Sequence, residues 1–398
     1  MAASNYGTYR QKRSNRQPQR TKTAVSNKSI STKLAGEVDY TFLFLVILLL
    51  CAGLVMLLSA SAPAANTTYG DSYYFFKKQV VGAILGIIGM WVISRINYER
   101  YKKYIPKFML VCIILLVLVL IPGIGVKVNG SRRWIATPGI QIQPSEFMKP
   151  TIAMYFALLI EQGKYDLKSW KGNLPFLGVI LIVVALMMCE THLSGSIVIA
   201  GVAVVVMIAG GTPVKPMIVG ALILLPIGIL GVYMFSPVRW NRIMSFLHPF
   251  DDMQNTGYQV AQGLYAIGSG GVFGLGLGQS VQKYSYLPEP YNDFIFAIVC
   301  EELGLVGATV VILLFVALIL RIIKIAINAP DVYSSLTAVG IAAQIAIQTT
   351  LNIAVATSTV PNTGVALPFF SYGGTAILTL LLEMGILLNI SRYEKVKD

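Results

Sequence analysis

The chain has 398 residues, of which 55% are hydrophobic and only 12% are charged, and its formal net charge is +13. A soluble domain does not need so much apolar surface, and the apolar runs recur at lengths of about 20 residues, enough to cross ~30 Å of hydrocarbon. The composition therefore excludes a soluble globular protein and predicts an all-α, multi-pass membrane protein.

The N-terminal residues 1–40 are polar and basic, and no cleavable signal peptide precedes the first apolar run. A basic segment of this kind could bind nucleic acid or a partner. We expect instead a disordered cytoplasmic tail that is attracted to anionic lipid.

Apolar segments bounded by Pro, Gly and charged residues follow the tail. They predict ten transmembrane helices, over residues 41–60, 79–94, 108–122, 145–160, 172–189, 195–210, 216–235, 293–320, 333–356 and 366–390. Together these form a membrane domain over 41–392, and residues 393–398 form a short cytoplasmic tail.

Lys and Arg are concentrated in alternate connections, which places both termini in the cytoplasm. Residues 236–292 then form a large extracytoplasmic loop between the seventh and eighth helices. Two outer connections carry basic residues against this rule: Lys127, Arg132, Arg133 and Lys149 in the first, and Arg239, Arg242 and Lys283 in the second. Such groups hold phosphate or carboxylate, which indicates an anionic ligand at the outer face; contact with lipid headgroups or pairing with nearby acids is the alternative.

An unusual group of acids lies in the stretch PEPYNDFIFAIVCEELG, residues 288–304. Since Pro288 and Pro290 do not fit a helix interior, the eighth helix should start at about Asn292 or Asp293. Asp293 would then lie in the first turn, at the outer boundary of the membrane. An Asp there is either a helix cap or a functional group.

The other acids of this stretch have different expected roles. Glu289 lies in the loop, where it could orient Asp293 or bind a cation with it. Glu301 and Glu302 lie some 12–14 Å deeper at 1.5 Å per residue, too deep to share a ligand with Asp293. We expect them to form a buried pair with Lys149 or another cation.

Two further motifs flank predicted helices. In QPSEFMKP, Glu146 and Lys149 are three residues apart and can pair on one helix face, although Lys149 could instead contact the ligand. LPFFSYGG, residues 367–374, is predicted to open the last helix, with Tyr372 suited to the interface and Gly373 permitting close approach. The glycine-rich segment 268–280 lacks the context of a nucleotide site and is interpreted as a flexible loop.

Three stretches together resemble one family: GSRRWIATPGIQIQPSEFMKP (130–150), LPEPYNDFIFAIVCEELGLVG (287–307) and NTGVALPFFSYGGTAILTLLLEMGILLNISR (362–392). They are similar to the SEDS proteins of shape, elongation, division and sporulation, which include FtsW, RodA and SpoVE. The resemblance covers nearly the whole chain beyond the first 40 residues. The sequence around Asp293 is closest to the division and sporulation branch.

The resemblance implies a bacterial peptidoglycan glycosyltransferase that polymerises lipid II at the outer face of the cytoplasmic membrane. It makes Asp293 the general base that deprotonates the GlcNAc 4-hydroxyl, while the glycan leaves its undecaprenyl pyrophosphate carrier with inversion. The implied pyrophosphate contacts are Arg132, Arg133, Lys149, Arg239, Arg242 and Lys283. The implied supporting residues are Glu289, Trp134, Glu146, Glu301, Glu302, Ser371, Tyr372 and Gly373.

The resemblance also implies partners: a class B penicillin-binding protein as transpeptidase, and other divisome or elongasome membrane proteins. Nucleic acid is not expected, nor is a nucleotide or organic cofactor. A divalent cation, Mg²⁺ or Mn²⁺, would help a pyrophosphate group to leave.

One segment departs from the family pattern. In CETHLSGS, residues 189–196, His192 stands where many relatives carry the acid of a PDLG-type segment, and Glu190 lies nearby. A lone His can bind a metal or be merely polar, so the metal requirement stays open. Two other functions also stay open: a lipid II flippase, and a non-catalytic scaffold that activates the transpeptidase.

Overall fold

The structure, a computed structural model, describes residues 36–128, 131–137, 140–235, 240, 244, 246, 250–251 and 257–393. Arg239 and Arg242, two of the predicted pyrophosphate contacts, lie outside these residues, as do residues 1–35 of the predicted tail and the last residues 394–398.

The described chain is mostly helical. Its helices are α1 (Tyr40–Tyr69), α2 (Tyr74–Arg95), α3 (Tyr98–Lys102), α4 (Ile105–Leu120), α5 (Pro144–Glu161), α6 (Trp170–Cys189), α7 (Leu193–Ala209), α8 (Val214–Phe235), α10 (Tyr258–Gly270), α11 (Ile295–Asn328), α12 (Val332–Ala356) and α13 (Gly374–Ser391). Each of the ten predicted membrane segments overlaps one of these helices. By length and hydropathy, the described residues contain six helices able to cross a membrane, namely α1, α2, α6, α11, α12 and α13, while α4 and α7 are apolar but shorter.

The prediction of an all-α fold is corrected by a small sheet in the connection between α4 and α5. Its strands are β1 (Gly125–Val128), β2 (Ser131–Thr137) and β3 (Ile140–Ile142), in the order β1-β2-β3, and both pairs are antiparallel. The alternation of β-branched and polar residues in this connection is a strand pattern that the sequence interpretation had not used.

Several helix boundaries differ from prediction: α2 begins five residues earlier, at Tyr74, and α11 continues from residue 320 to Asn328. Helix α1 continues past Pro63 to Tyr69, and the Thr67 hydroxyl donates a hydrogen bond to the Pro63 carbonyl at 3.0 Å. Helix α13 begins at Gly374, so LPFFSYGG precedes the helix instead of opening it. Phe369 in that stretch has φ of 66°, a left-handed conformation that ends any regular helix before it.

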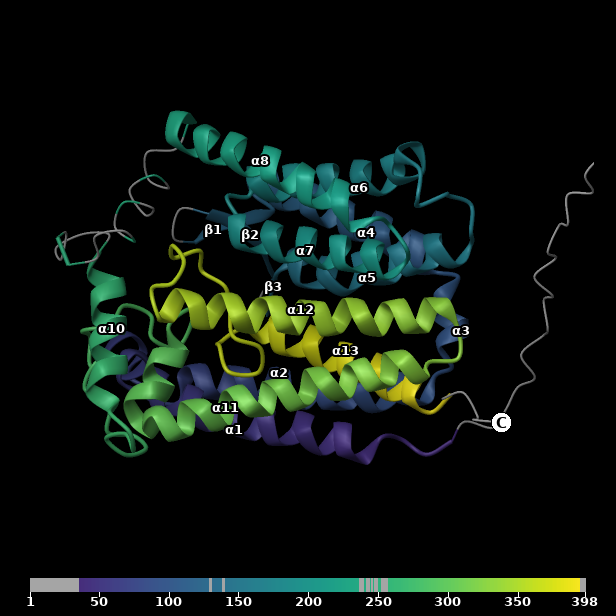
Figure 1. The fold of residues 1–398 in the computed structure, drawn as a ribbon. Helices are drawn as coiled ribbons and strands as arrows, with labels where there is room; N and C mark the ends of the chain where they lie inside the picture. The colour runs from purple at the N-terminus through teal and green to yellow at the C-terminus, as the bar shows by residue number, and fades with distance from the viewer. Residues whose placement is uncertain are drawn as a thin grey trace, which may run out of the picture. The chain divides into compact units, whose positions relative to one another are not determined.

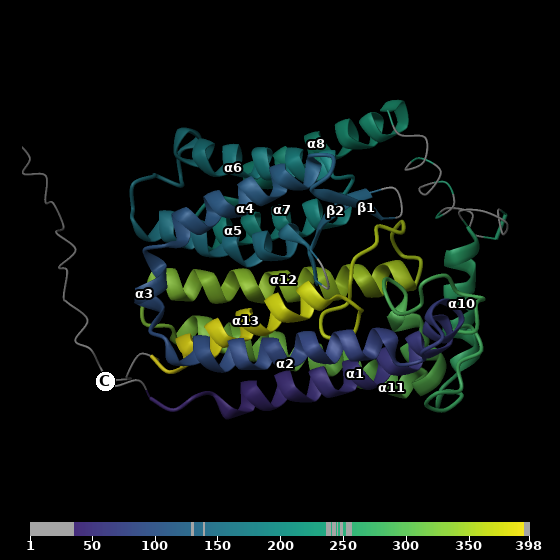
Figure 2. The ribbon, with the colours of Figure 1, turned by 180° about the vertical axis from the view of Figure 1, so that it is seen from behind.

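Helix α12 lies between two groups of helices, with α4 to α8 on one side and α1, α2, α11 and α13 on the other (Figures 1 and 2). This central place makes α12 one of the most buried apolar helices, and most of its polar residues are buried. One end of the bundle carries the β1–β3 sheet, the α6–α7 connection and the start of α11; it is called the sheet end below. Helix α3 lies at the opposite end.

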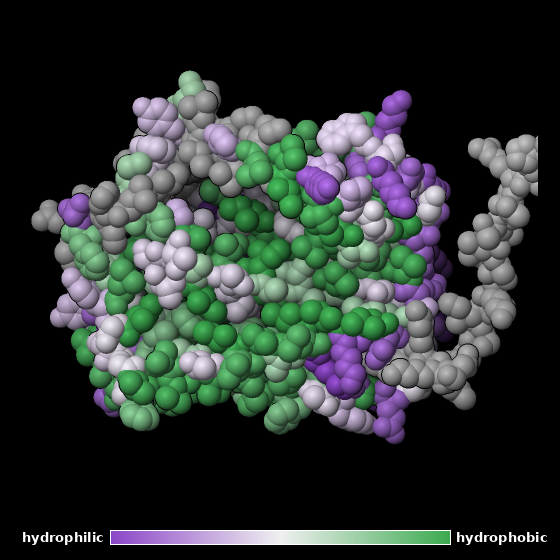
Figure 3. Space-filling view, viewed as in Figure 1, coloured by the Kyte–Doolittle hydropathy of each residue, from purple (hydrophilic) through white to green (hydrophobic). Residues whose placement is uncertain are grey.

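The outer faces of the helices are apolar. Leu181, Leu313 and Val81 are between 58% and 70% exposed, as expected for side chains that contact lipid. Figure 3 shows hydrophobic residues across the middle of the visible face and hydrophilic residues toward the end that carries α3.

Candidate active site

Asp293 lies just before α11, at the sheet end. The helix begins at Ile295 with Phe294 as its N-cap, so Asp293 is not in the first turn as predicted. The reason is that the Asp293 carbonyl accepts a hydrogen bond from the Asn352 side chain of α12, at 2.8 Å, while the Ala297 N–H donates to the Phe294 carbonyl. The backbone of Asp293 is therefore held by a tertiary contact with α12.

The carboxyl group of Asp293 packs against the loop that follows α12. A methyl group built on Gly364 would lie 3.0 Å from the Asp293 Oδ2 atom, and Gly364 has φ of +71°. The Ser194 hydroxyl of α7 donates to the Gly364 carbonyl at 3.1 Å, and the Asn362 side chain accepts from the Gly364 N–H at 3.1 Å. Only glycine can place backbone this close to the carboxyl group without strain.

The LPFFSYGG loop is bonded to the backbone beside Asp293. The Ser371 hydroxyl donates to the Asn292 carbonyl at 2.6 Å, and the Tyr372 N–H donates to the Tyr291 carbonyl at 2.9 Å. From α2, the buried Gln79 accepts from the Gly373 N–H at 3.0 Å and donates to the Ser371 carbonyl at 3.3 Å. Ser371, Tyr372 and Gly373 thus support the segment that carries Asp293.

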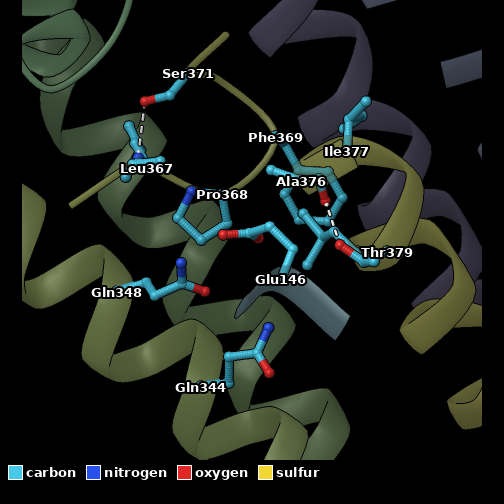
Figure 4. A pocket seen from close by; sticks show the side chains of 12 residues that line it. Glu146, Gln344, Gln348, Leu367, Pro368, Phe369, Ser371, Ala376, Ile377 and Thr379 are labelled. Atoms are coloured by element: carbon cyan, nitrogen blue, oxygen red, sulfur yellow. Dashed lines mark hydrogen bonds between the residues drawn. The ribbon is translucent and has the colours of Figure 1, made fainter. Parts of the chain in front are cut away.

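Glu146 and Lys149 form a buried ion pair near the start of α5. The Lys149 ammonium lies 2.7 Å from the nearer Glu146 carboxylate oxygen. The Lys149 side chain is 5% exposed, and the Glu146 side chain is 12% exposed. Glu146 also lines a cavity of about 20 Å³ together with Gln348 and Ser371, and its carboxyl group is directed toward Pro368 (Figure 4). The predicted i,i+3 pairing is therefore confirmed. Because Glu146 and Ser371 line the same cavity, the start of α5 lies beside the LPFFSYGG loop.

A second buried acid lies deeper in the bundle, beyond this cavity. Glu383 of α13 is 1% exposed and accepts from the Gln344 side chain of α12 at 2.9 and 3.0 Å. Sequence reasoning missed Glu383 and Gln344, as well as Asn352 and Gln79. Polar residues inside apolar segments are rare, and that rarity was the available signal.

Glu301 and Glu302 bind the glycine-rich segment that follows α10. Glu302 pairs with the buried Lys283 at 2.8 Å and accepts from the Ser59 hydroxyl of α1. Glu301 accepts from the Val281 N–H at 2.9 Å and from the Ser280 hydroxyl. The partner of the pair is therefore Lys283, not Lys149.

Lys283 does not lie beside Asp293, although it was predicted to bind the same anionic ligand. Its ammonium group donates to Glu302, to the Ser59 hydroxyl and to the Gly278 carbonyl, and its side chain is 4% exposed. These three bonds use the donors of an ammonium group. The structure thus places Lys283 with the deep acids and not with Asp293.

Arg132, Arg133 and Trp134 lie on β2, where Trp134 is paired with Val126 of β1. The Arg133 guanidinium donates to the Thr191 carbonyl at 2.9 Å and thereby links the sheet to the α6–α7 connection. Arg132 lines a cavity beside the same connection. Both basic residues therefore remain at the sheet end, where Asp293 also lies.

Glu190 and His192, in the α6–α7 connection, are buried. Burial raises the pKa of Glu190 to about 8, although the nearby Arg133 acts in the opposite direction. Burial, with Arg133 and Lys149, holds the pKa of His192 well below its usual range. Burial thus disfavours the charged form of both side chains.

The predicted acids do not form a metal site by themselves. Within the described part of the chain, no three His, Cys, Asp or Glu side chains cluster so that they could hold an ion. Glu289 accepts from the Asn292 side chain at 3.0 Å, and its backbone has φ of +47°.

Comparison with known proteins identifies the family. The family model described as cell cycle protein, FtsW/RodA/SpoVE, matches residues 40–396. The chain is 43% identical to stage V sporulation protein E of Bacillus subtilis over 90% of this chain and 98% of that protein. It is 39% identical to the probable peptidoglycan glycosyltransferase FtsW of Trichlorobacter lovleyi, over 89% and 93% of the two chains.

Solved structures agree with these sequence matches. A chain from a structure described as "Structural coordination of polymerization and crosslinking by a peptidoglycan synthase complex" is similar with a TM-score of 0.76 and 26% identity, over 89% of this chain and 98% of that one. The rod shape determining protein RodA of Thermus thermophilus gives a TM-score of 0.67 and 26% identity, over 89% and 97%. The chain therefore belongs to the FtsW/RodA/SpoVE family and is a multi-pass membrane protein.

Proposed function

We propose that this protein is a peptidoglycan glycosyltransferase that polymerises lipid II at the outer face of the bacterial cytoplasmic membrane. Relatives named as such enzymes match most of its length. The observation that carries the mechanism is the place of Asp293, whose backbone and carboxyl group are held by α12, the Gly364 loop and the LPFFSYGG loop.

In the proposed reaction, Asp293 accepts the proton of the acceptor GlcNAc 4-hydroxyl as that oxygen attacks C1 of the donor sugar. A C1–O4 bond forms, the bond from C1 to the pyrophosphate oxygen breaks, and the configuration at C1 inverts. The undecaprenyl pyrophosphate leaves with both electrons of the broken bond. A second catalytic acid is not needed, because pyrophosphate is a stable leaving group.

The basic residues of the sheet end are the proposed pyrophosphate contacts. Arg132 and Arg133 lie on β2, and Lys149 lies nearby in its pair with Glu146. Guanidinium groups stabilise the charge that grows on phosphate oxygens as the bond breaks. Mg²⁺ usually takes one or two carboxylates together with phosphate oxygens and water, so a requirement for Mg²⁺ or Mn²⁺ remains a prediction.

Membrane orientation and partnership complete the proposal. Ten spans with both termini in the cytoplasm put the sheet end, with Asp293, on the outer side. The similar chain from a structure described as coordinating polymerization and crosslinking supports a class B penicillin-binding protein as the transpeptidase partner. The proposed role lies in division or sporulation, in line with the similar stage V sporulation protein E and FtsW.

The test is glycan synthesis from purified lipid II by the full chain with a class B partner that has no glycosyltransferase domain. Wild type should make long glycan, and Asp293→Asn should lose activity by at least a hundredfold, within the range that a general base contributes. Thermal unfolding of the variant confirms that it folds, and addition of EDTA with Mg²⁺ or Mn²⁺ rescue tests the cation. Equal product from both proteins would remove Asp293 from the mechanism, and no product from either would favour the flippase or scaffold.

A further inference from the structure

Aromatic side chains form a continuous group of ring contacts beside the segment that carries Asp293. They come from the end of α1, the start of α2, the segment before α11 and the LPFFSYGG loop. The group, called the aromatic cluster below, consists of Tyr69, Tyr74, Phe75, Tyr291 and Tyr372. The proposed mechanism uses none of these rings, so packing or a further ligand must account for the cluster.

The cluster leads from an exposed position to the candidate base. Tyr69 stacks on Tyr74 with ring centroids 3.8 Å apart and an interplanar angle of 12°, and Tyr74 contacts Phe75 edge to face at 5.4 Å. Phe75 in turn stacks on Tyr291 at 4.5 Å. Tyr291 lies just before Asn292 and Asp293 in the chain, so a ligand that lies along the cluster extends toward Asp293.

Packing explains the inner rings of the cluster but not the outer one. Phe75 is 8% exposed and also contacts the Tyr372 ring at 4.9 Å, as a core side chain does. Tyr69 is 51% exposed, although one face of its ring is covered by Tyr74. The exposed area of Tyr69 therefore includes the opposite face of its ring.

The surroundings of Tyr69 are polar and charged. Residues 66–68, which precede it in the last turn of α1, are exposed and polar. The Lys77–Asp71 ion pair lies in and beside the α1–α2 connection, and its side chains are 66% and 38% exposed. An ion pair this exposed is stable in water and not in hydrocarbon. The open face of Tyr69 is thus beside water, where a lipid tail does not suit it.

A sugar ring is a ligand that matches an aromatic face in water. The face of an aromatic ring carries partial negative charge. A β-linked pyranose ring presents weakly positive C–H groups on both of its faces, while its hydroxyl groups lie around the rim. Sugar rings therefore stack on aromatic faces, and polar side chains nearby can bond the hydroxyl groups. Asn66 and Thr68 are exposed side chains of this kind next to Tyr69.

We propose that the aromatic cluster is a saccharide-binding subsite that holds the growing glycan strand, with one sugar ring stacked on the open face of Tyr69. The occupant follows from continuity with the candidate active site, because the cluster joins the α1–α2 connection to Tyr291 and the LPFFSYGG loop beside Asp293. This choice of occupant rests on the proposed function, in which the strand is lengthened at Asp293.

The first experiment measures binding without turnover. It uses the full chain in phosphatidylcholine nanodiscs and a soluble, fluorescently labelled octasaccharide of alternating GlcNAc and MurNAc, which carries neither lipid nor pyrophosphate. Fluorescence anisotropy gives the affinity. Tyr69→Leu should weaken binding about fivefold because one stacking contact is lost, whereas Tyr69→Phe keeps the ring and should stay within about twofold of wild type.

The matched control is Tyr284→Leu. Tyr284 is 60% exposed, lies on the same side of the membrane in the proposed topology, and has the Lys283 ammonium 5.8 Å from its ring centroid. Within the described part of the chain it stacks on no other aromatic ring. Its replacement should change octasaccharide affinity by less than about twofold, because it removes an interfacial tyrosine without touching the cluster.

Glycan length gives a second readout, with lipid II as substrate and the class B partner present. Tyr69→Leu should make shorter strands than wild type and Tyr284→Leu, because a strand that is held less tightly dissociates after fewer additions. Gel electrophoresis of the product measures length. Thermal unfolding confirms that Tyr69→Leu folds, as expected for a half-exposed position.

The two assays keep failure of the subsite distinct from failure of the proposed function. Glycan synthesis by a wild-type protein that binds no octasaccharide would overturn the subsite and leave the proposed function standing. Octasaccharide binding that depends on the Tyr69 ring, in a protein that makes no glycan, would support the subsite and count against the proposed function. Equal effects of Tyr69→Leu and Tyr284→Leu, or a Tyr69→Phe variant as weak as Tyr69→Leu, would also overturn the subsite.

Discussion

At the scale of single residues, side chains from other elements hold the backbone around the candidate base. Asn352 bonds the Asp293 carbonyl, and Ser371 bonds the carbonyl of the preceding residue, Asn292. Asn352 is fully buried and also donates to the Val365 carbonyl at 2.7 Å, so it joins the two loops on either side of the carboxyl group. Small displacements of a reacting group cost much activity, which explains why such a site needs rigid support.

Gly364 offers the sharpest test of this positioning. In Gly364→Ala the new methyl group would meet Asp293 Oδ2 at 3.0 Å, and we expect kcat to fall about tenfold or more while KM changes little. The control Gly163→Ala has a similar φ, +61°, with no atom within 4 Å of the added methyl group, so it carries the backbone strain alone. Steady-state polymerisation kinetics compare them, and equal losses would show that strain and not the carboxyl contact matters.

At the scale of elements, α11 is interrupted so that it can hold the glycine-rich segment. Gly304 has φ of 66° and ψ of −169° inside the helix, and this break frees backbone groups on both sides of it. The Glu301 and Glu302 carbonyls accept from the N–H groups of Leu275 and Gly276, at 2.9 and 3.0 Å. Residues 268–280 were predicted to be a flexible loop, but residues 268–270 belong to α10, and Leu275 and Gly276 are hydrogen-bonded to α11.

The ion pair between Lys283 and Glu302 secures this arrangement. Lys283→Met would leave a buried carboxylate without its cation, and we expect a loss of stability of about 3–5 kcal/mol. Lys77→Met is the control, because the Lys77–Asp71 pair at 2.8 Å is exposed, and it should cost far less stability than Lys283→Met. Thermal unfolding in detergent measures both, and a similar small loss would place Lys283 in a role other than architecture.

At the scale of the whole molecule, the charged residues of the candidate site gather at one end of the helix bundle. Asp293, Arg132, Arg133 and the Glu146–Lys149 pair all lie at or near the sheet end, whereas the exposed helix faces between the ends are apolar. Chemistry confined to one end suits an enzyme that works at one membrane surface. A path across both leaflets would need polar groups along its whole length.

The proposed topology can be measured directly. In a background without Cys51, Cys112, Cys189 and Cys300, Tyr284→Cys should react with a membrane-impermeant maleimide in intact cells. Lys164→Cys, in the connection between α5 and α6, should react only after permeabilisation. Both positions are exposed, so accessibility to the reagent reports the side of the membrane. Labelling of both in intact cells would contradict the proposed orientation.

The sequence by itself determined the helical membrane fold, the helix positions to within a few residues in most cases, and the family. Those features depend on hydropathy and on local motifs, which single segments carry. The prediction failed where local pattern and tertiary contact compete. Asp293 was placed in a first helical turn because prolines precede it, but the bond from Asn352 moves the helix start to Ile295.

Apart from the i,i+3 pair of Glu146 and Lys149, only the tertiary structure decided which charged groups meet. Lys283 was predicted beside an anionic ligand and lies instead in a buried pair with Glu302, while Glu190 and Arg132, far apart in the sequence, line one cavity. The energy of a charge depends on its burial and on its nearest opposite charge. Both are properties of packed segments, so no pattern within one segment could have predicted them.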